Sequence, residues 1–144
     1  MAGEQEPTIA AADYEQELRN FFQTTAPAPA FDLVLLGLGE DGHTASLFPG
    51  SAALKETTRS VASAYVERLY AHRLTLTLPV MNAAAQVSLL VAGESKSAIL
   101  KALLGEDSNP TRHPAGLVRR PVTGELTWFV TQDAAAGIAV SQNG

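Results

Sequence analysis

The chain lacks cysteine, carries few basic residues and has no long apolar run, and each absence argues against a class of protein. Without cysteine, neither a disulfide bond nor a thiolate metal site can form. Ten lysines and arginines stand against fifteen acids, which gives a formal net charge of -5 and argues against a nucleic-acid surface. Since no apolar run approaches the length of a membrane span, we expect a cytoplasmic protein without membrane contacts.

What is present is enough for one globular domain. The 144 residues are 46% hydrophobic, a share that can bury a sizeable core. Residues 1–7 are polar, and we expect a disordered N-terminus there. From Thr8 to Phe22 apolar residues recur at helical spacing, with Glu15 among the polar residues on the other side. We therefore expect a single α/β domain over residues 8–144.

Strand and helix signals alternate along the rest of the chain. Strands are expected at residues 33–36, 60–66, 73–78, 86–91, 116–118 and 126–131. Short helices are expected at residues 79–85, at 96–104 with Ser95 as N-cap, and at 133–136, with a turn at 121–124. This alternation predicts a Rossmann-like, mostly parallel sheet with helices on both faces. The continuous apolar run of residues 33–36 predicts a strand that is buried on both faces.

A glycine-rich turn follows that first strand. Gly37, Gly39 and Gly42 match the G-x-G-x-x-G spacing of dinucleotide-binding sites. Such a site needs a full helix directly after the third glycine and an acid about twenty residues further on. Here the pair at residues 49–50 stops any helix, and residues 57–62 contain no acid. The turn therefore argues for a ligand site at the sheet edge and against bound NAD.

Asp41 and His43 place acid–base chemistry in the same turn. A neutral imidazole can take a proton from water, and an acid two residues away can orient the ring. The glycine-rich backbone could also direct amide groups at a developing oxyanion. A purely structural interpretation stays open, in which Asp41 caps the turn and His43 is an ordinary loop residue. Taken alone, the Asp-Gly-His motif favours that structural interpretation.

The longer string GLGEDGHTASLFPG, residues 37–50, closely resembles the signature of the 6-phosphogluconolactonase family. The similarity continues in the same order through residues 73–83, 91–96, 114–118 and 124–129. This resemblance implies a cofactor-free cytosolic hydrolase of the pentose phosphate pathway, which converts 6-phospho-D-glucono-1,5-lactone to 6-phosphogluconate. It also implies a fold related to glucosamine-6-phosphate deaminase and ribose-5-phosphate isomerase.

The resemblance also assigns roles to individual residues. His43 corresponds to the general base that activates water, Asp41 to the acid beside it, and Lys96 to the lysine associated with the substrate phosphate. Lys96 follows a strand and lies in the first turn of an expected helix, a suitable place for an anion. Further substrate contacts are expected from Gly39, Gly42, Thr44 and Arg73. For Lys96 and Arg73 the alternative is a solvated surface side chain.

The resemblance is to the later part of the family only. Family members carry earlier strands, a glycine-rich phosphate loop and an arginine segment that have no counterpart here. We therefore expect open strand edges or apolar faces, and self-association or binding of a complementary N-terminal half. Two alternatives remain: an amino-sugar phosphate isomerase or deaminase, and a non-catalytic sugar-phosphate-binding module.

Overall fold

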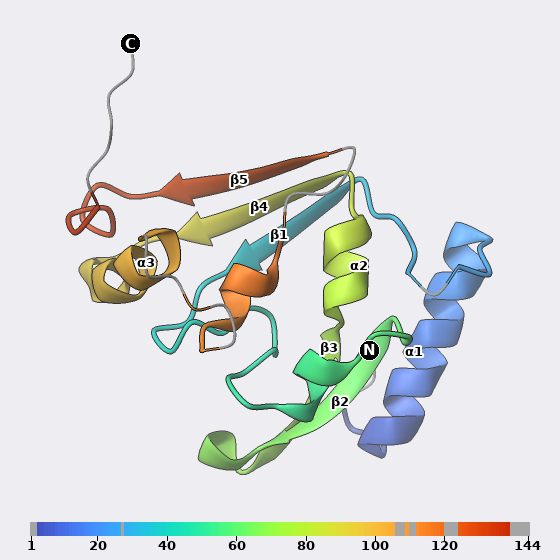
Figure 1. Cartoon of the computed structure of the whole chain (residues 1–144). Helices are drawn as coiled ribbons and strands as arrows, with labels where there is room; N and C mark the ends of the chain where they lie inside the picture. Colours follow the sequence, from blue (N-terminus) through green and yellow to red (C-terminus); the bar gives the residue numbers. More distant parts are fainter. Residues whose placement is uncertain (1–2, 27, 106–108, 110–111, 120–123, 139–144) are drawn as a thin grey trace.

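The computed structural model describes residues 3–26, 28–105, 109, 112–119 and 124–138 (Figure 1). The helices are α1 (Pro7–Phe22), α2 (Leu78–Ala83) and α3 (Ser97–Leu104). The strands are β1 (Leu33–Gly37), β2 (Val61–Val66), β3 (Ala71–Leu76), β4 (Gln86–Val91) and β5 (Glu125–Val130). Short 3-10 turns are η1 (Ala52–Lys55), η2 (Glu67–Leu69), η3 (Glu94–Lys96) and η4 (Pro114–Leu117). None of the described helices is both long and apolar enough to cross a membrane.

The central sheet has three parallel strands in the order β1-β4-β5. Leu36 lies opposite Leu89, and Leu89 lies opposite Trp128, so one row of apolar side chains crosses all three strands. Strands β2 and β3 form a separate antiparallel pair, and α1 packs against it (Figure 1). The expected mostly parallel α/β fold is confirmed. Residues 73–78 and 86–91 were expected to flank one crossover, but β3 pairs with β2 and not with β4.

One face of the three-stranded sheet forms the core. Val34, Leu36, Val87, Leu89 and Val91 point to this face, and each is buried. The same hydrophobic cluster contains side chains from both α2 and α3, so these helices cover this face. Burial of this kind contributes about 25 cal/mol per Å² of apolar surface removed from water, and it dominates the stability of the sheet.

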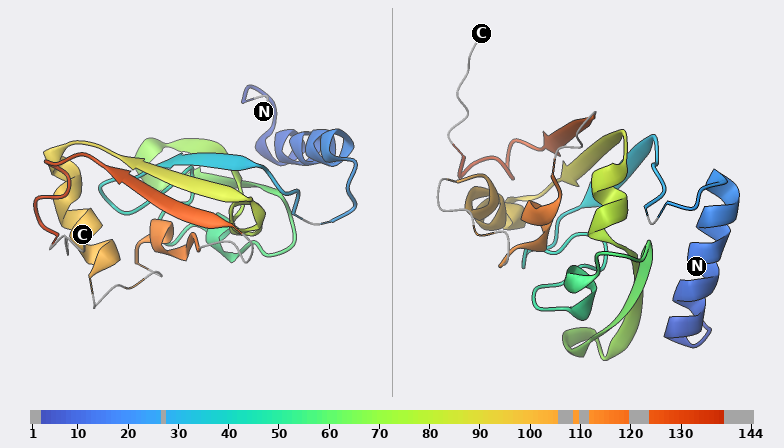
Figure 2. Two further views of the ribbon diagram at one scale, coloured as in Figure 1. Left: turned by 90° about the horizontal axis from the view of Figure 1, so that it is seen from above. Right: turned by 45° about the vertical axis from the view of Figure 1, so that its right-hand side comes forward.

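The opposite face of the same sheet is open. Leu33 and Leu35 of β1, Leu90 of β4 and Phe129 of β5 are all exposed, Leu35 by 60% and Phe129 by 57%. Figure 2 (left) looks down on these strands, and no described helix crosses them. The prediction that β1 is buried on both faces is therefore wrong. Helices were expected on both faces of this sheet, but the helices in the described residues cover only the face that forms the core.

Helix α1 joins the second sheet through a buried acid. Pro7 begins the helix, one residue before the expected start, and the Glu6 carboxylate accepts hydrogen bonds from the amides of Thr8 and Ile9. Glu15, expected on the solvent side, is buried. Its carboxylate accepts hydrogen bonds from Arg59 Nε and from the Ser60 amide, each at 3.0 Å. These bonds satisfy the buried charge and connect α1 to the start of β2.

Three smaller expectations are corrected. The segment expected as a strand at residues 116–118 belongs to the 3-10 turn η4, whose first residue is a proline. The residues expected as a helix at 133–136 form turns, in which Asp133 accepts a hydrogen bond from the Ala134 amide. Ser95 lies inside η3, and α3 begins at Ser97 without a side-chain cap among the described residues. The expected turn at 121–124 lies outside the described residues except for Gly124.

Candidate active site

The loop after β1 is held in a tight turn at the carboxyl edge of the sheet. The Gly39 amide donates to the His43 carbonyl at 2.8 Å, and the Gly42 amide donates to the Gly39 carbonyl at 2.9 Å. A Cβ atom on Gly39 would lie 1.9 Å from His43 Nδ1, so a larger residue would displace the imidazole. Gly42 has φ +80°, and a Cβ there would meet His113 at 2.8 Å. Both glycines therefore let the turn close on itself.

Asp41 and His43 form a close pair within this turn. Asp41 Oδ1 lies 2.5 Å from His43 Nδ1 and also accepts a hydrogen bond from the His43 amide at 3.1 Å. Both side chains remain partly exposed, His43 by 25% and Asp41 by 32%. With a carboxylate as the partner, Nδ1 carries the proton and Nε2 keeps the free lone pair. The pair can therefore accept a proton at Nε2.

The charge state of Asp41 follows from its surroundings. Partial burial raises the pKa of Asp41, but the hydrogen bonds from His43 and the charge of Arg68 outweigh this effect. Together they hold the pKa below its ordinary value, so Asp41 is a carboxylate at neutral pH. An ionised Asp41 orients the imidazole and stabilises the imidazolium that forms when the ring accepts a proton.

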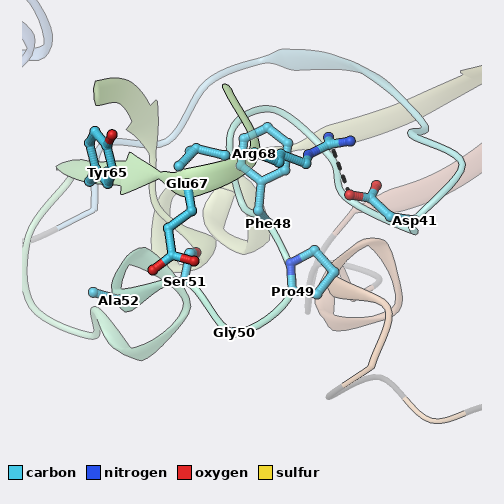
Figure 3. A pocket seen from close by; sticks show the side chains of 10 residues that line it. Asp41, Phe48, Pro49, Gly50, Ser51, Ala52, Tyr65, Glu67 and Arg68 are labelled. Carbon is cyan, nitrogen blue, oxygen red and sulfur yellow. Dashed lines mark ion pairs between the residues drawn. The ribbon is translucent and has the colours of Figure 1, made fainter. Parts of the chain in front are cut away.

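Two further side chains contact this pair, and the sequence did not point to them. The ring of Phe48 lies 4.3 Å from the His43 ring, measured between centroids. Arg68 lies in η2, the turn between β2 and β3, and its Nη2 is 3.2 Å from Asp41 Oδ2. Figure 3 shows Arg68 lying against Phe48 and reaching toward Asp41. Arg68 is far from Asp41 in sequence, and no local motif links the two residues.

Lys96 reaches the same region from the loop after β4. It ends η3 and directly precedes α3, close to its expected place. Its Nζ lies 3.6 Å from Glu40 Oε1, a second contact that the sequence did not predict. A surface hollow of about 430 Å³ opens here, and it is lined by Gly37, Leu38, Gly39, His43, Ala45 and Lys96. The structure therefore brings Gly39, His43 and Lys96 together.

Thr44 and Arg73 lie elsewhere. Thr44 is 1% exposed, and its hydroxyl donates to the Gly37 carbonyl at 2.8 Å, which fixes the end of β1. Arg73 is exposed on β3 and lines a different hollow, beside Ser46. The structure places neither side chain in the hollow that contains His43 and Lys96. Gly42 is also outside its lining and packs against His113 instead.

A second hollow, of about 570 Å³, is lined in part by Asp41 (Figure 3). Its lining combines apolar side chains with the charged groups of Asp41, Glu67 and Arg68. Asp41 thus lines the second hollow, whereas its partner His43 lines the first. Within the described ranges, no three histidine, aspartate or glutamate side chains are gathered so as to hold a metal ion.

Fold and site together define an α/β protein with an acid–base pair in a glycine-rich turn at the carboxyl edge of a parallel sheet. Residues 1–128 match the family described as Glucosamine-6-phosphate isomerases/6-phosphogluconolactonase. The chain belongs to this family.

Individual relatives agree with this assignment. The chain is 46% identical over 132 residues to the 6-phosphogluconolactonase of Homo sapiens, and the match covers 91% of this chain and 50% of the human protein. It is 42% identical over 134 residues to the 6-phosphogluconolactonase of Synechocystis sp., with 92% of this chain and 54% of that protein covered. The chain thus spans about half the length of the curated relatives it matches.

Solved structures have the same fold. The crystal structure of devB protein superposes with a TM-score of 0.85 at 33% identity, over 94% of this chain and 56% of that one. The 6-phosphogluconolactonase from Trypanosoma brucei superposes with a TM-score of 0.78 at 28% identity, over 92% and 54%. The likeness therefore includes nearly the whole of this chain and about half of each neighbour.

Proposed function

We propose that this chain takes part in the hydrolysis of 6-phospho-D-glucono-1,5-lactone to 6-phosphogluconate, a cytoplasmic reaction of the pentose phosphate pathway. The observation that carries the proposal is the 2.5 Å contact between Asp41 and His43, which leaves His43 Nε2 free as a base. The names of the relatives support the same reaction class.

The chemistry needs one base and one water molecule. His43 Nε2 takes a proton from water while the water oxygen bonds to the lactone carbonyl carbon. The ester bond of the ring then breaks, and the imidazolium returns its proton to the departing ring oxygen. Asp41 holds the ring in place and stabilises its charge during the step. The new carboxylic acid ionises in water and releases one proton.

Lys96 is the proposed contact for the substrate phosphate. It lines the same hollow as His43 and is 22% exposed, so an anion can reach its ammonium group. Glu40, which is 67% exposed, is the present partner of Lys96 and can swing into solvent when a phosphate takes its place. Gly39 contributes to the same hollow. Substrate contacts of Gly42, Thr44 and Arg73 stay predictions.

The open face of the sheet supports a larger assembly. Four large apolar side chains, Leu33, Leu35, Leu90 and Phe129, are exposed on adjacent strands. Exposed apolar patches of this kind commonly mark interaction surfaces. We propose that this face is covered by a complementary segment, equivalent to the part of the relatives that the match leaves out, or by a second copy of the chain.

The same observation favours a second candidate function. A chain that spans half of its relatives and leaves one sheet face open could bind sugar phosphates without catalysing their hydrolysis. An amino-sugar phosphate isomerase is a third candidate, since the matched family includes that activity in its description. The two candidate enzymes would form different products, and a binding module would form none.

Lactone hydrolysis by the purified chain tests the proposal. The chain is assayed alone and mixed with the part of the human relative outside the match, and each rate is compared with spontaneous lactone opening. Acceleration in either sample, lost with His43→Ala in the same sample, is the expected result. Binding of 6-phosphogluconate with no acceleration in both samples would identify a binding module. Sedimentation of the same samples reports whether the chain associates with the added part or with a second copy, as covering of the open face requires.

A further inference from the structure

Arg68 approaches the acid–base pair from a different part of the fold. It lies in η2, the turn that reverses the chain between β2 and β3, whereas Asp41 and His43 follow β1 of the central sheet. Its Nη2 lies 3.2 Å from Asp41 Oδ2 and 3.4 Å from His43 Nδ1, and the second contact is not a hydrogen bond when Nδ1 carries the proton. The guanidinium carbon lies 4.8 Å from the centre of the Phe48 ring. Arg68 thus contacts Asp41, His43 and Phe48.

The contacts divide the two oxygens of Asp41 between two partners. Oδ1 faces the imidazole and the amide of His43, while Oδ2 faces Arg68. A carboxylate held at both oxygens cannot rotate away from either partner without losing an interaction. Phe48 limits the movement of both partners, because its ring contacts the His43 ring and the Arg68 guanidinium.

We propose that Arg68 is a positioning residue, which fixes the Asp41 carboxylate so that His43 keeps its proton on Nδ1 and presents Nε2 as the base. The inference rests on the proposed function for its effect on turnover. Its effect on the imidazole itself does not depend on any reaction.

Arg68 also acts through its charge. A cation close to both members of the pair opposes the uptake of a further proton by that pair. Other charges nearby are those of Glu40 and Lys96, which form an ion pair at 3.6 Å, and Glu67, which lines the second hollow with Arg68. Loss of Arg68 makes the net charge around Asp41 and His43 more negative. The pair should then take up its proton at a higher pH.

The location of Arg68 makes it suitable for substitution. Its side chain is 55% exposed and lies outside both hydrophobic clusters, so Arg68→Met and Arg68→Lys should fold. Lys55→Met is the matched control, because Lys55 is exposed at the end of η1 and lines neither hollow beside Asp41. Both methionine variants remove one positive charge from the surface.

The first measurement is the pH profile of lactone hydrolysis in the sample that is active. With Arg68→Met we expect kcat to fall about tenfold, within the range of losses caused by misplaced catalytic groups, and KM to change much less. The acid limb of the kcat/KM profile should move to higher pH. Arg68→Lys should return that limb toward its original position, and Lys55→Met should leave it unchanged. A rise in KM alone would make Arg68 a substrate contact and overturn the inference.

The second measurement needs no activity. Long-range ¹⁵N NMR spectra of the imidazoles, assigned with His43→Asn, report which ring nitrogen carries the proton. We expect the Nδ1–H form of His43 in the unaltered chain, and in Arg68→Met a mixture of tautomers with proton uptake at higher pH. His72 and His113 serve as internal references. Unchanged His43 signals would overturn the inference, whereas changed signals together with no lactonase activity in either sample would sustain it and reject the proposed function.

Discussion

Two loops meet at the carboxyl edge of the central sheet, and they are built differently. One follows β1 and contains Asp41 and His43; the other follows β4 and ends in Lys96. Because β1 and β4 are parallel neighbours, both loops leave the sheet on the same side. This shared edge brings a base and a cation into one hollow although they are far apart in sequence.

The β1 loop is fixed at several points by its own residues. Gly39 leaves the space that the His43 ring occupies, Asp41 binds both the ring and the amide of His43, and Thr44 ties the loop to Gly37. The β4 loop has fewer contacts of this kind. Gly93 has φ +97°, and a Cβ there would meet no described atom within 4 Å. Its amide donates to Thr131 Oγ1 at 3.2 Å, and the Lys96 side chain contacts one exposed acid, Glu40. A base requires a fixed position, whereas a long cation can adjust to its anion.

The substitution with the largest expected effect is His43→Ala, in the β1 loop. In the sample that hydrolyses the lactone, His43→Ala should lower kcat by roughly a hundredfold or more, the usual scale for a lost general base. The comparison variant is His72→Ala, an exposed residue on β3 outside the hollow of His43. Turnover of His43→Ala within a few fold of the unaltered chain would contradict the assignment of the base.

Alanine at one glycine of each loop compares the loops directly. Gly39→Ala puts a Cβ into the His43 ring and within 2.8 Å of Asp41 Oδ1, so we expect kcat to fall by about tenfold or more. Gly93→Ala meets no described atom within 4 Å, but its positive φ should cost about 1–3 kcal/mol of stability. We therefore measure turnover and urea unfolding on both variants. Gly39→Ala should lose the larger share of turnover, and Gly93→Ala should lose stability with a smaller loss of turnover. Equal loss of turnover in the two would remove the distinction.

Lys96→Ala tests the role of the β4 loop in recognising the substrate phosphate. We expect kcat/KM for the phosphorylated lactone to fall about tenfold more than that for an unphosphorylated analogue, in keeping with one charge-assisted contact. The readout is the ratio of the two values, since a general defect lowers both equally. An unchanged ratio would mean that Lys96 supports the fold or the chemistry and does not recognise phosphate.

The smallest expected effect comes from the partner of Lys96. Glu40→Gln removes the acid that now competes for the ammonium group, and KM for the phosphorylated lactone should fall by about two- to threefold. The change should shrink as salt is added, because exposed charges are screened. A KM that rises would show that Glu40 helps to place Lys96, so that the β4 loop is held more firmly than we infer.

The sequence alone determined the local part of this protein. Amphipathic spacing marked α1, apolar runs marked β1 and β4, and the glycine spacing marked the turn that contains Asp41 and His43. These two residues lie two positions apart, so their contact follows from the shape of a single tight turn. The family resemblance, which rests on the same local strings, is confirmed by the match over residues 1–128.

Only the tertiary structure decided the contacts between residues that are far apart in sequence and the exposure of each sheet face. Arg68 reaches Asp41 from the turn between β2 and β3, the hydroxyl of the buried Thr44 donates to the Gly37 carbonyl, and Leu35 is exposed although its strand is apolar throughout. An apolar run shows that a strand can be buried, but it does not show how many of its faces are covered. Contacts between segments depend on how the sheets and helices pack against one another, and a pattern within one segment carries no information about its neighbour in space.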